Sequence, residues 1–368
     1  MNISSLKNIS NALAESGLDA LALNPGFSLL FASGLHFHLM ERPTIVFFTA
    51  DGQIAIVLPE LEVAKLNNLP YDIKAFPYGE NPKTWTKVFR NAIKHLDLDG
   101  KKVGVEPLAM RIFEYRYLQA AAPLTTFPDA TETIASLRMI KGEKEINALR
   151  KAAEIAQNAL EATLPMIKVG VSEKRIASEL VSQLLKNGSE SPLPFQPIVS
   201  GGPNSANPHA TPTERKLQEG DLLVIDWGAR YKDYVSDITR TFAIGKIDAE
   251  YRKIHEIVQK ANAAGRAAAK PGLPAKVVDI AARKVIENTG YGEYFTHRTG
   301  HGIGMEGHEA PYMRDDNERI LEVGMAFTVE PGIYLPNRNG VRVEDDLVIT
   351  KDGAESLSTL PREIRVLG

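Results

Sequence analysis

The amino-acid sequence predicts an α+β protein with two domains, a smaller one over residues 1–132 and a larger one over residues 138–368. Two observations predict this class. Helix and strand patterns alternate as far as about residue 122, and prolines then interrupt them. Beyond that point, the order helix, helix, acid-bearing hairpin occurs twice. A chain of 368 residues, 43% of them apolar, can fill two ordinary hydrophobic cores.

In the smaller, α/β domain, each element is expected from a short local pattern. The turn Ala50-Asp51-Gly52 separates two apolar runs, 44–49 and 53–58, and predicts a hairpin. Further strands are expected at 20–24 and 102–106, and helices at 4–17, 84–96 and 111–121. Because Pro123 and Pro128 follow, we place the domain boundary at about 128–138.

Four helices are expected in the larger domain, in two pairs. The first begins after Gly142, which can act as an N-cap with Glu145 three residues further on. Its apolar face is formed by Ile146, Leu149, Ala153, Ala156 and Leu160. The second follows Ser172 and ends at Asn187-Gly188. The other pair runs from about 248 to just before Pro271, and from about 274 to 288.

Two segments, 222–242 and 325–350, each carry two carboxylates on either side of a turn-rich centre. Asp226 and Asp237 are symmetric about the step from 231 to 232, and Glu330 and Glu344 about residue 337. If each segment is a hairpin, each places two acids opposite each other on neighbouring strands. Like charges at that distance repel, so we expect a cation, most simply a metal pair, between them.

The two halves of the larger domain also repeat in residue type. Leucine, glycine, acid and glycine recur at a constant offset of 104 residues: Leu217, Gly220, Asp226 and Gly228 correspond to Leu321, Gly324, Glu330 and Gly332. Chance matches of glycine and leucine are common, but the acid also falls in register. The repeat therefore predicts an internal duplication that brings the two hairpins together about a pseudo-twofold axis.

The acids and nearby histidines suit hard or borderline divalent ions, with Mn²⁺ or Co²⁺ ahead of Cu²⁺. Two ions roughly 3.5–4 Å apart would neutralise four carboxylates and supply a nucleophile at neutral pH. Asp226 carries most weight, because it lies in an apolar strand where burial is costly. The alternative is that the acids cap turns or lie solvated at strand edges.

Three histidines stand beside the hairpins in stretches rich in glycine or proline, which we read as loops: His209, His301 and His308. A single histidine is more often structural than catalytic, but three in such places favour a role. The glycines around His301 do not form the GxGxxG pattern of dinucleotide-binding proteins.

Five short motifs stand out in the larger domain: Asp226-x-Gly228, 236–241 (SDITRT), 300–304 (GHGIG), 328–332 (TVEPG) and 341–345 (VRVED). Together they resemble the M24-type proline-specific metallopeptidase family, which includes creatinase, aminopeptidase P and prolidase and has the pita-bread fold. The resemblance covers the chain from about Leu137 to the end and, more loosely, the N-terminal domain, which resembles the family's creatinase-like N-terminal domain.

The resemblance implies five ligands for two metal ions, Mn²⁺ or Co²⁺ before Zn²⁺: Asp226, Asp237, His301, Glu330 and Glu344. It implies hydrolysis of the bond before proline in Xaa-Pro dipeptides or short peptides by a metal-bridging hydroxide, with no nucleic-acid or membrane partner and with a homodimer as the assembly. Glu330 would relay the proton, His308 would stabilise the oxyanion and His209 would bind substrate and shuttle a proton. Arg342 matches the family's arginine two residues before the last ligand, on the same strand face as Glu344.

One residue departs from the prolidase pattern. Tyr312 stands where some prolidases have an arginine associated with the dipeptide's carboxylate, which leaves aminopeptidase P-like action on longer peptides as an alternative. Near the N-terminus, His36 and His38 match a segment that can line the partner's site in such dimers, so they are candidate substrate contacts alongside Tyr312. A plain surface loop explains the two histidines equally well.

Net charge, the absence of cysteine and the five expected ligands argue against other partners and functions. A formal net charge of −3 gives no electrostatic reason to expect nucleic acid or an anionic membrane as a partner, and without cysteine there are no thiolate ligands or disulfides. No signal peptide and no apolar run of roughly 18 residues are seen, so we expect a cytoplasmic protein. A metal-free creatinase-like hydrolase or a non-catalytic pita-bread binding protein would lack the five ligands. A methionine aminopeptidase would not need the first domain.

Overall fold

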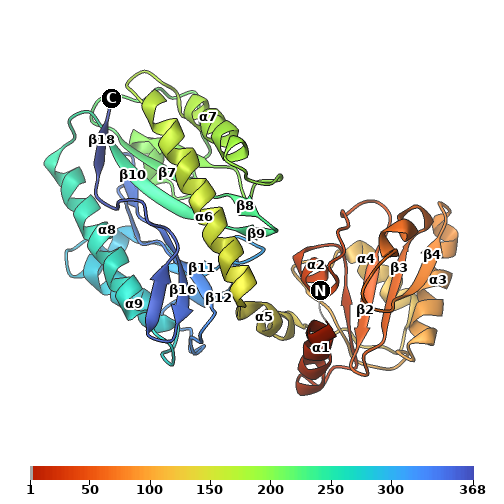
Figure 1. The fold of residues 1–368 in the computed structure, drawn as a ribbon. Coiled ribbons are helices and arrows are strands. Elements are labelled where there is room, and N and C mark those ends of the chain that lie inside the picture. Colours follow the sequence, from red (N-terminus) through yellow and green to blue (C-terminus); the bar gives the residue numbers. More distant parts are fainter. Residues whose placement is uncertain (1–2) are drawn as a thin grey trace. The chain divides into compact units, whose positions relative to one another are not determined.

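The computed structural model describes residues 3–368, and the chain divides into two compact units, Met1–Arg138 and Met139–Gly368. Both are mixtures of helices and strands (Figure 1). Each has its own sheets and its own clusters of buried apolar side chains. No helix within residues 3–368 has the length and apolar character needed to cross a membrane.

A mixed sheet in the strand order β4-β3-β2-β1-β5 forms the centre of the N-terminal unit. β2 pairs antiparallel with β1 and β3, whereas β4 and β5 join the two edges in parallel. The strands are β1 (Ala20–Leu23), β2 (Ile45–Thr49), β3 (Ile54–Pro59), β4 (Lys74–Tyr78) and β5 (Val103–Gly104). The helices are α1 (Ile3–Glu15), α2 (Phe27–Ser33), η1 (Glu60–Leu66), α3 (Pro82–His95), α4 (Ile112–Ala121) and α5 (Thr131–Met139).

Both faces of this sheet are covered. Phe47 belongs to the apolar cluster that includes Phe89 of α3 and Leu118 of α4. The next residue, Phe48, points to the opposite face and belongs to the cluster with Leu13 of α1. Two covered faces explain why every residue of β2 and β3 is buried and apolar or small, with no polar alternation.

The elements expected from the sequence are present, with ends that differ by at most two residues, but α2, η1, β4 and α5 were not predicted. α2 has seven residues, too few to show a helical period. α5 occupies the segment that we took as a boundary. It begins at Thr131, whose backbone N–H donates to the Asp129 carboxylate in the turn that leads into the helix.

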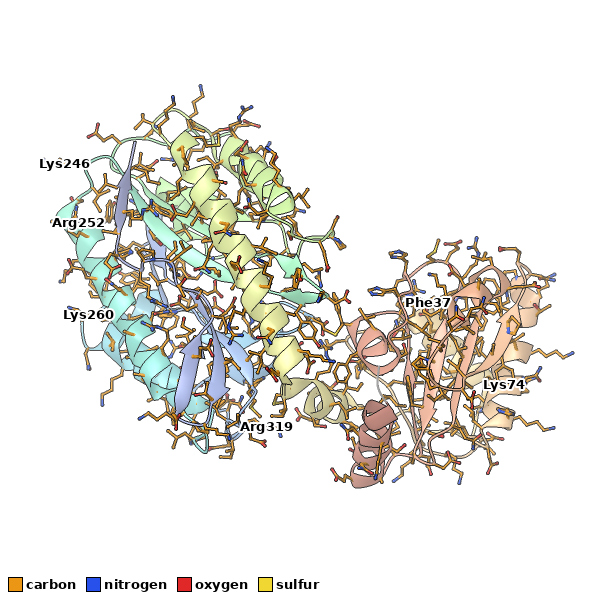
Figure 2. All side chains as sticks on the ribbon, viewed as in Figure 1. Phe37, Lys74, Lys246, Arg252, Lys260 and Arg319 are labelled. Carbon is orange, nitrogen blue, oxygen red and sulfur yellow. The ribbon has the colours of Figure 1, made fainter. Side chains whose placement is uncertain are left out.

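In the C-terminal unit, the two predicted helix pairs are confirmed. They are α6 (Glu143–Thr163) with α7 (Glu173–Lys186), and α8 (Ala249–Ala268) with α9 (Lys276–Glu287). Gly142, Ser172 and Asp248 are the N-caps of α6, α7 and α8. α8 is amphipathic: Arg252 and Lys260 point away from the unit (Figure 2), while the opposite face is buried.

Two sheets lie between the helix pairs. One has the order β18-β10-β7-β6, from β6 (Ile198–Gly201), β7 (Leu222–Trp227), β10 (Ile238–Ile244) and β18 (Arg365–Leu367). The other has the order β12-β11-β13-β16-β17, from β11 (Gly300–Gly302), β12 (Glu309–Met313), β13 (Ala326–Val329), β16 (Asp345–Thr350) and β17 (Gly353–Ser356). Two ribbons extend them: β8 (Arg230–Tyr231) with β9 (Tyr234–Val235), and β14 (Gly332–Tyr334) with β15 (Gly340–Arg342). Short 3₁₀ turns are η2 (Leu164–Met166), η3 (Gly202–Ala206) and η4 (Gly292–Tyr294).

The internal duplication is confirmed by backbone hydrogen bonds that recur in both halves. Four bonds illustrate it: Gly170 N–H to Leu217 O and Gly220 N–H to Ile244 O in the first half, and Gly272 N–H to Leu321 O and Gly324 N–H to Ile349 O in the second. Each pair joins the same points of the helix–helix–hairpin unit. The fold therefore presents two equivalent hairpins to one another.

The registers of the two hairpins differ in how well they were predicted. Asp226 lies opposite Thr239, so Asp237 is its diagonal neighbour, not its direct partner as expected. The cause is the turn, in which Lys232 and Asp233 take the two central positions with φ of 48° and 67° and shift the centre by one residue. In the second hairpin, the ladders on both sides of Glu330 and Glu344 are centred on residue 337, so these acids oppose each other as predicted.

Candidate metal centre and active site

Strand alternation explains why Asp226 faces the site. On β7, Leu223, Ile225 and Trp227 belong to the apolar cluster that contains α6 and α7. Asp226 lies between them in sequence and therefore projects from the opposite face. Asp237 has the same parity as Thr239, the residue opposite Asp226, so both acids of the first hairpin lie on one face.

The structure brings together the five residues that the resemblance implies as ligands, here called the acid–histidine cluster: Asp226, Asp237, His301, Glu330 and Glu344. They come from both sheets and from the short connections beside them. Their side-chain oxygen and nitrogen atoms form overlapping groups whose members lie within 4.8 Å of one another. His301 lies 3.3 Å from Glu330 Oε1 and 3.7 Å from Asp237 Oδ2 through its Nε2. His301 is in β11, not in a loop as predicted, which gives it a rigid position.

Two oxygens of this cluster have no protein partner. Within residues 3–368, Asp226 Oδ1 and Glu344 Oε1 are buried and make no hydrogen bond. Their companion oxygens are satisfied: Asp226 Oδ2 accepts from Arg342 Nη2, and Glu344 Oε2 accepts from Thr239 Oγ1 at 2.6 Å. A buried carboxylate oxygen without a donor is costly, so these two atoms fit a bound cation.

The electrostatics of the cluster lead to the same conclusion. Burial raises the pKa of Asp226, Asp237 and Glu344, and the neighbouring acids raise the pKa values of Asp237 and Glu344 further. Glu330 behaves differently: burial favours its neutral form, but the hydrogen bond and charge of His301 lower its pKa to about 2. A divalent cation between these groups would remove the repulsion and let all four acids ionise.

Arg342 connects the cluster to its surroundings. Its guanidinium donates to Asp226 Oδ2, to Thr239 Oγ1 at 3.1 Å and to the Tyr334 hydroxyl at 2.9 Å. Burial disfavours the charge of Arg342, but Tyr334 and the acids keep its pKa well above the ordinary value. These three bonds hold Asp226 and, through Thr239, Glu344 in place.

Tyr334 and His297 belong to the site but were not predicted. His297 Nδ1 lies 2.7 Å from the Arg298 carbonyl, which can only accept, so Nδ1 carries the proton. His297 Nε2 is then the acceptor for the Tyr334 hydroxyl at 2.9 Å. The spacing was the available signal: His297 precedes His301, and Tyr334 follows Glu330, each by four residues.

His308 lies at the rim of the cluster. Its ring centre is 3.9 Å from that of His301, and burial together with the charge of His301 lowers its pKa to about 4. His308 Nδ1 lies 3.5 Å from Nη2 of Arg298. Arginine can only donate, so Nδ1 accepts and the neutral ring carries its proton on Nε2.

His209 is exposed on a loop whose two ends are hydrogen-bonded to the buried carboxylate of Glu173. The Glu173 carboxylate, fully buried at the start of α7, accepts hydrogen bonds from the backbone N–H groups of Gly201 and Thr213. The Asn204 side chain also donates to it. Glu173 thus fastens both ends of the His209 loop, a role that its position in the sequence did not reveal.

A cavity of about 900 Å³ opens onto the acid–histidine cluster. One wall is apolar and formed by Pro194, Phe195 and Ile198, while His209, His297, His308, Arg298 and Arg314 also line the cavity. Tyr312, half-buried on β12, carries the Arg298 guanidinium over its ring at 4.5 Å from the ring centre. His36 and His38 lie in the N-terminal unit, where both are exposed.

This arrangement agrees with comparisons to known proteins. Residues 147–351 match metallopeptidase family M24, and residues 6–140 match the creatinase/prolidase N-terminal domain. The chain therefore belongs to metallopeptidase family M24. Membership makes it a peptidase whose chemistry uses divalent metal ions.

Individual relatives match over almost the whole chain. An Xaa-Pro dipeptidase of Lactobacillus delbrueckii subsp. lactis is 35% identical over 363 residues, 98% of this chain and 98% of its own. A probable dipeptidase PepE of Mycobacterium tuberculosis is 38% identical, covering 97% of this chain and 94% of its own. The crystal structure of a prolidase from Thermococcus sibiricus superposes with a TM-score of 0.94 and 32% identity, covering 100% of both chains. The expected pita-bread fold with a creatinase-like N-terminal domain is thereby confirmed.

Proposed function

We propose that this protein is a prolidase-like peptidase that hydrolyses the peptide bond before proline in Xaa-Pro dipeptides, with two divalent metal ions held by the acid–histidine cluster. The observation that carries the proposal is the cluster itself, in which three buried acids and the partly buried Glu330 meet one histidine, and two carboxylate oxygens lack partners. The similarity to an Xaa-Pro dipeptidase and to a prolidase supports the substrate class.

Asp226, Asp237, His301, Glu330 and Glu344 would hold the two ions. Four carboxylates and one imidazole suit Mn²⁺ or Co²⁺, and Zn²⁺ less well. When bound, such ions polarise a carbonyl oxygen and lower the pKa of a coordinated water, so that a nucleophile exists at neutral pH. Arg342 orients Asp226 for this duty through its hydrogen bond to Oδ2.

Proton transfer and charge stabilisation fall to groups of the chain. Glu330, with a pKa of about 2, is ionised at neutral pH and can accept the proton of the attacking water and return it to the proline nitrogen. His308, with a pKa of about 4, is neutral at that pH. Its Nε2–H can donate to the oxygen of the tetrahedral intermediate. His209, exposed on its loop, would contact the substrate, and the apolar wall would receive its side chains.

Steady-state kinetics with added Mn²⁺ test the proposal. We expect kcat/KM for a dipeptide such as Ala-Pro to exceed that for Ala-Pro-Yaa-Zaa by tenfold or more. A preference for the longer peptide would assign aminopeptidase P-like action instead. Hydrolysis of neither substrate would exclude an Xaa-Pro peptidase. Undiminished activity after complete metal removal would point to the metal-free, creatinase-like alternative.

Four expectations from the sequence stay predictions. A homodimer follows only from the resemblance, and sedimentation velocity at several protein concentrations would test it. A cytoplasmic location and a substrate role for His36 and His38 also stay predictions, as does a direct substrate contact for Tyr312.

A further inference from the structure

Arg298 is a cation in a cavity that is otherwise rich in acids. It lines the cavity together with Glu330 and His308, and it is only partly buried. Its position is three residues before His301, on the chain segment that leads into β11. The mechanism proposed above uses Arg298 only as a neighbour of His308, so its charge has no assigned function.

The other arginines that line this cavity are paired with acids. Arg342 donates to Asp226, and Arg314 Nε lies 3.0 Å from Asp316 Oδ1. Within residues 3–368, the Arg298 guanidinium forms no ion pair with a carboxylate, and its one hydrogen bond is the 3.5 Å contact with His308 Nδ1. An unpaired guanidinium at the edge of a substrate cavity is a ready partner for an anionic group of the substrate.

The guanidinium is also held in a defined position. It lies over the ring of Tyr312, 4.5 Å from the ring centre. Its own backbone carbonyl accepts the Nδ1–H of His297, and the carbonyl of His297 accepts from Arg283 Nη2 at 2.8 Å. Arg283 is in turn paired with the buried Asp279 of α9. A group fixed in this way loses little conformational entropy on binding.

The proposed role of His308 brings the carboxylate of a dipeptide within reach of this group. His308 donates from Nε2 to the scissile carbonyl in the proposed mechanism, while its Nδ1 faces Arg298 at 3.5 Å. In a prolyl residue, three bonds of about 1.3 to 1.5 Å separate the scissile carbonyl carbon from the carboxylate carbon, a span of less than about 4 Å. One imidazole ring separates the two donors, so a prolyl residue whose scissile carbonyl contacts Nε2 can present its carboxylate to Arg298.

We infer that Arg298 binds the free C-terminal carboxylate of the Xaa-Pro dipeptide and so makes this chain select dipeptides. The inference rests on the proposed function and deepens it. Tyr312 then has a supporting role: it stands where some prolidases have an arginine, and here its ring carries the guanidinium that Arg298 supplies. An aminopeptidase substrate, whose proline carboxyl is in an amide bond, presents no charge to Arg298.

The test compares Ala-Pro with its neutral analogue Ala-Pro-amide in the same Mn²⁺-loaded preparation. The ratio of the two kcat/KM values is the measured quantity, because metal occupancy and the folded fraction cancel in it. For the unmodified protein we expect the acid to be preferred by about tenfold to hundredfold, the usual strength of a charge-assisted hydrogen bond. Arg298→Gln should reduce the preference to within about threefold, chiefly through KM for Ala-Pro. Any loss that acts through His308 lowers the rates for acid and amide alike and cancels in the ratio.

Three further variants sharpen the result. Arg298→Lys keeps the charge but loses the planar fork, so it should retain an intermediate preference. Arg338→Gln is a matched control, because Arg338 also lies over a tyrosine ring, that of Tyr251, but is exposed and paired with Glu250. It should keep the full preference. Arg314→Gln should keep it as well, because Arg314 already has a carboxylate partner.

Two outcomes would overturn the inference. If Arg298→Gln lowers kcat/KM for acid and amide in parallel, Arg298 acts only through His308. If Arg314→Gln abolishes the preference and Arg298→Gln does not, the anchor is Arg314. Failure of the proposed function looks different, since the unmodified protein would then hydrolyse neither Ala-Pro nor its amide.

Discussion

At the scale of single residues, the site depends on charges that the fold alone does not neutralise. Asp226, Asp237, Glu330 and Glu344 are gathered around one histidine, and among the described residues Arg342 alone supplies a permanent positive charge in direct contact. Burying like charges without counter-ions costs several kcal/mol per group in proteins. Such an arrangement indicates that a cation binds there, next to the unpartnered oxygens of Asp226 and Glu344.

A buried histidine far from this chemistry makes stability depend on pH. His255 on α8 is 1% exposed, and burial, with Arg240 and Arg252 nearby and Glu363 opposing them, lowers its pKa from 6.5 to about 4. Between these values the unfolded chain binds the proton and the folded chain does not. Stability is therefore lost as pH falls from about 6.5 to 4, by about 3 kcal/mol for this group.

Urea unfolding at a series of pH values measures this effect. His255→Leu removes the titrating group. The unfolding free energy of this variant should therefore fall by about 3 kcal/mol less than that of the unmodified protein between pH 6.5 and 4. Other acids titrate equally in both proteins, so the difference between the two slopes is the readout. Parallel slopes would show that folding does not lower the pKa of His255.

At the scale of elements, the second helix of each pair carries a buried acid that fastens a segment leading to the site. Glu173 on α7 holds the loop of His209. Asp279 on α9 accepts from the backbone N–H and hydroxyl of Thr299, two residues before His301. The helices thus do more than cover the sheets, because each fixes one histidine-bearing segment.

Glu173→Gln tests this role. Glutamine has the same size, but its NH₂ group would face backbone N–H donors, so at least one hydrogen bond is lost and a buried donor is left unsatisfied. We expect about 2–4 kcal/mol lower stability and a rise in KM for Ala-Pro, because the His209 loop is released. Glu179→Gln is the matched control on the same helix, where the carboxylate pairs only with Gln183, and it should change stability by less than about 0.5 kcal/mol. Equal effects of the two substitutions would contradict the anchoring role.

At the scale of the whole molecule, the C-terminal unit is a duplicated structure whose two hairpins meet at the acids. Metal ions that bind there bind the folded chain and not the unfolded one, so they contribute to its stability by mass action. The free energy of metal binding and that of folding are therefore linked in this protein.

Metal removal should lower the melting temperature. At a metal concentration a hundred times the dissociation constant, the stabilisation is about 2.7 kcal/mol, which corresponds to roughly 3–6 °C for a chain of this size. Calorimetry before and after chelation measures the shift, and Mn²⁺ or Co²⁺ should restore both the melting temperature and the activity. Asp237→Asn removes one buried acid, so it should abolish activity. Its melting temperature should also fall less on metal removal than that of the unmodified protein. A melting temperature unchanged by complete metal removal would contradict a metal site in the folded protein.

The residues alone predict the helices of the C-terminal unit, the repeat at an offset of 104 residues and the four acids of the cluster, whereas His301 was assigned as a ligand from the family resemblance. These follow from local signals: N-caps such as Ser172, apolar periodicity, and acids placed where strands should be apolar. The sequence also identified the second hairpin's register, because the turn residues around Asn337 are symmetric between its acids.

Only the tertiary structure decided the rest. The register of the first hairpin depends on a turn centred on Lys232 and Asp233, and neither residue type predicts a turn at that position. The parts played by Glu173, Tyr334 and Arg298 depend on contacts with residues distant in the chain or on other elements, and no periodicity encodes such contacts. Which acids are buried, which oxygens lack a donor and which arginine has no acid beside it are properties of packing. A sequence shows which groups are available, and the fold decides which of them are left without a partner.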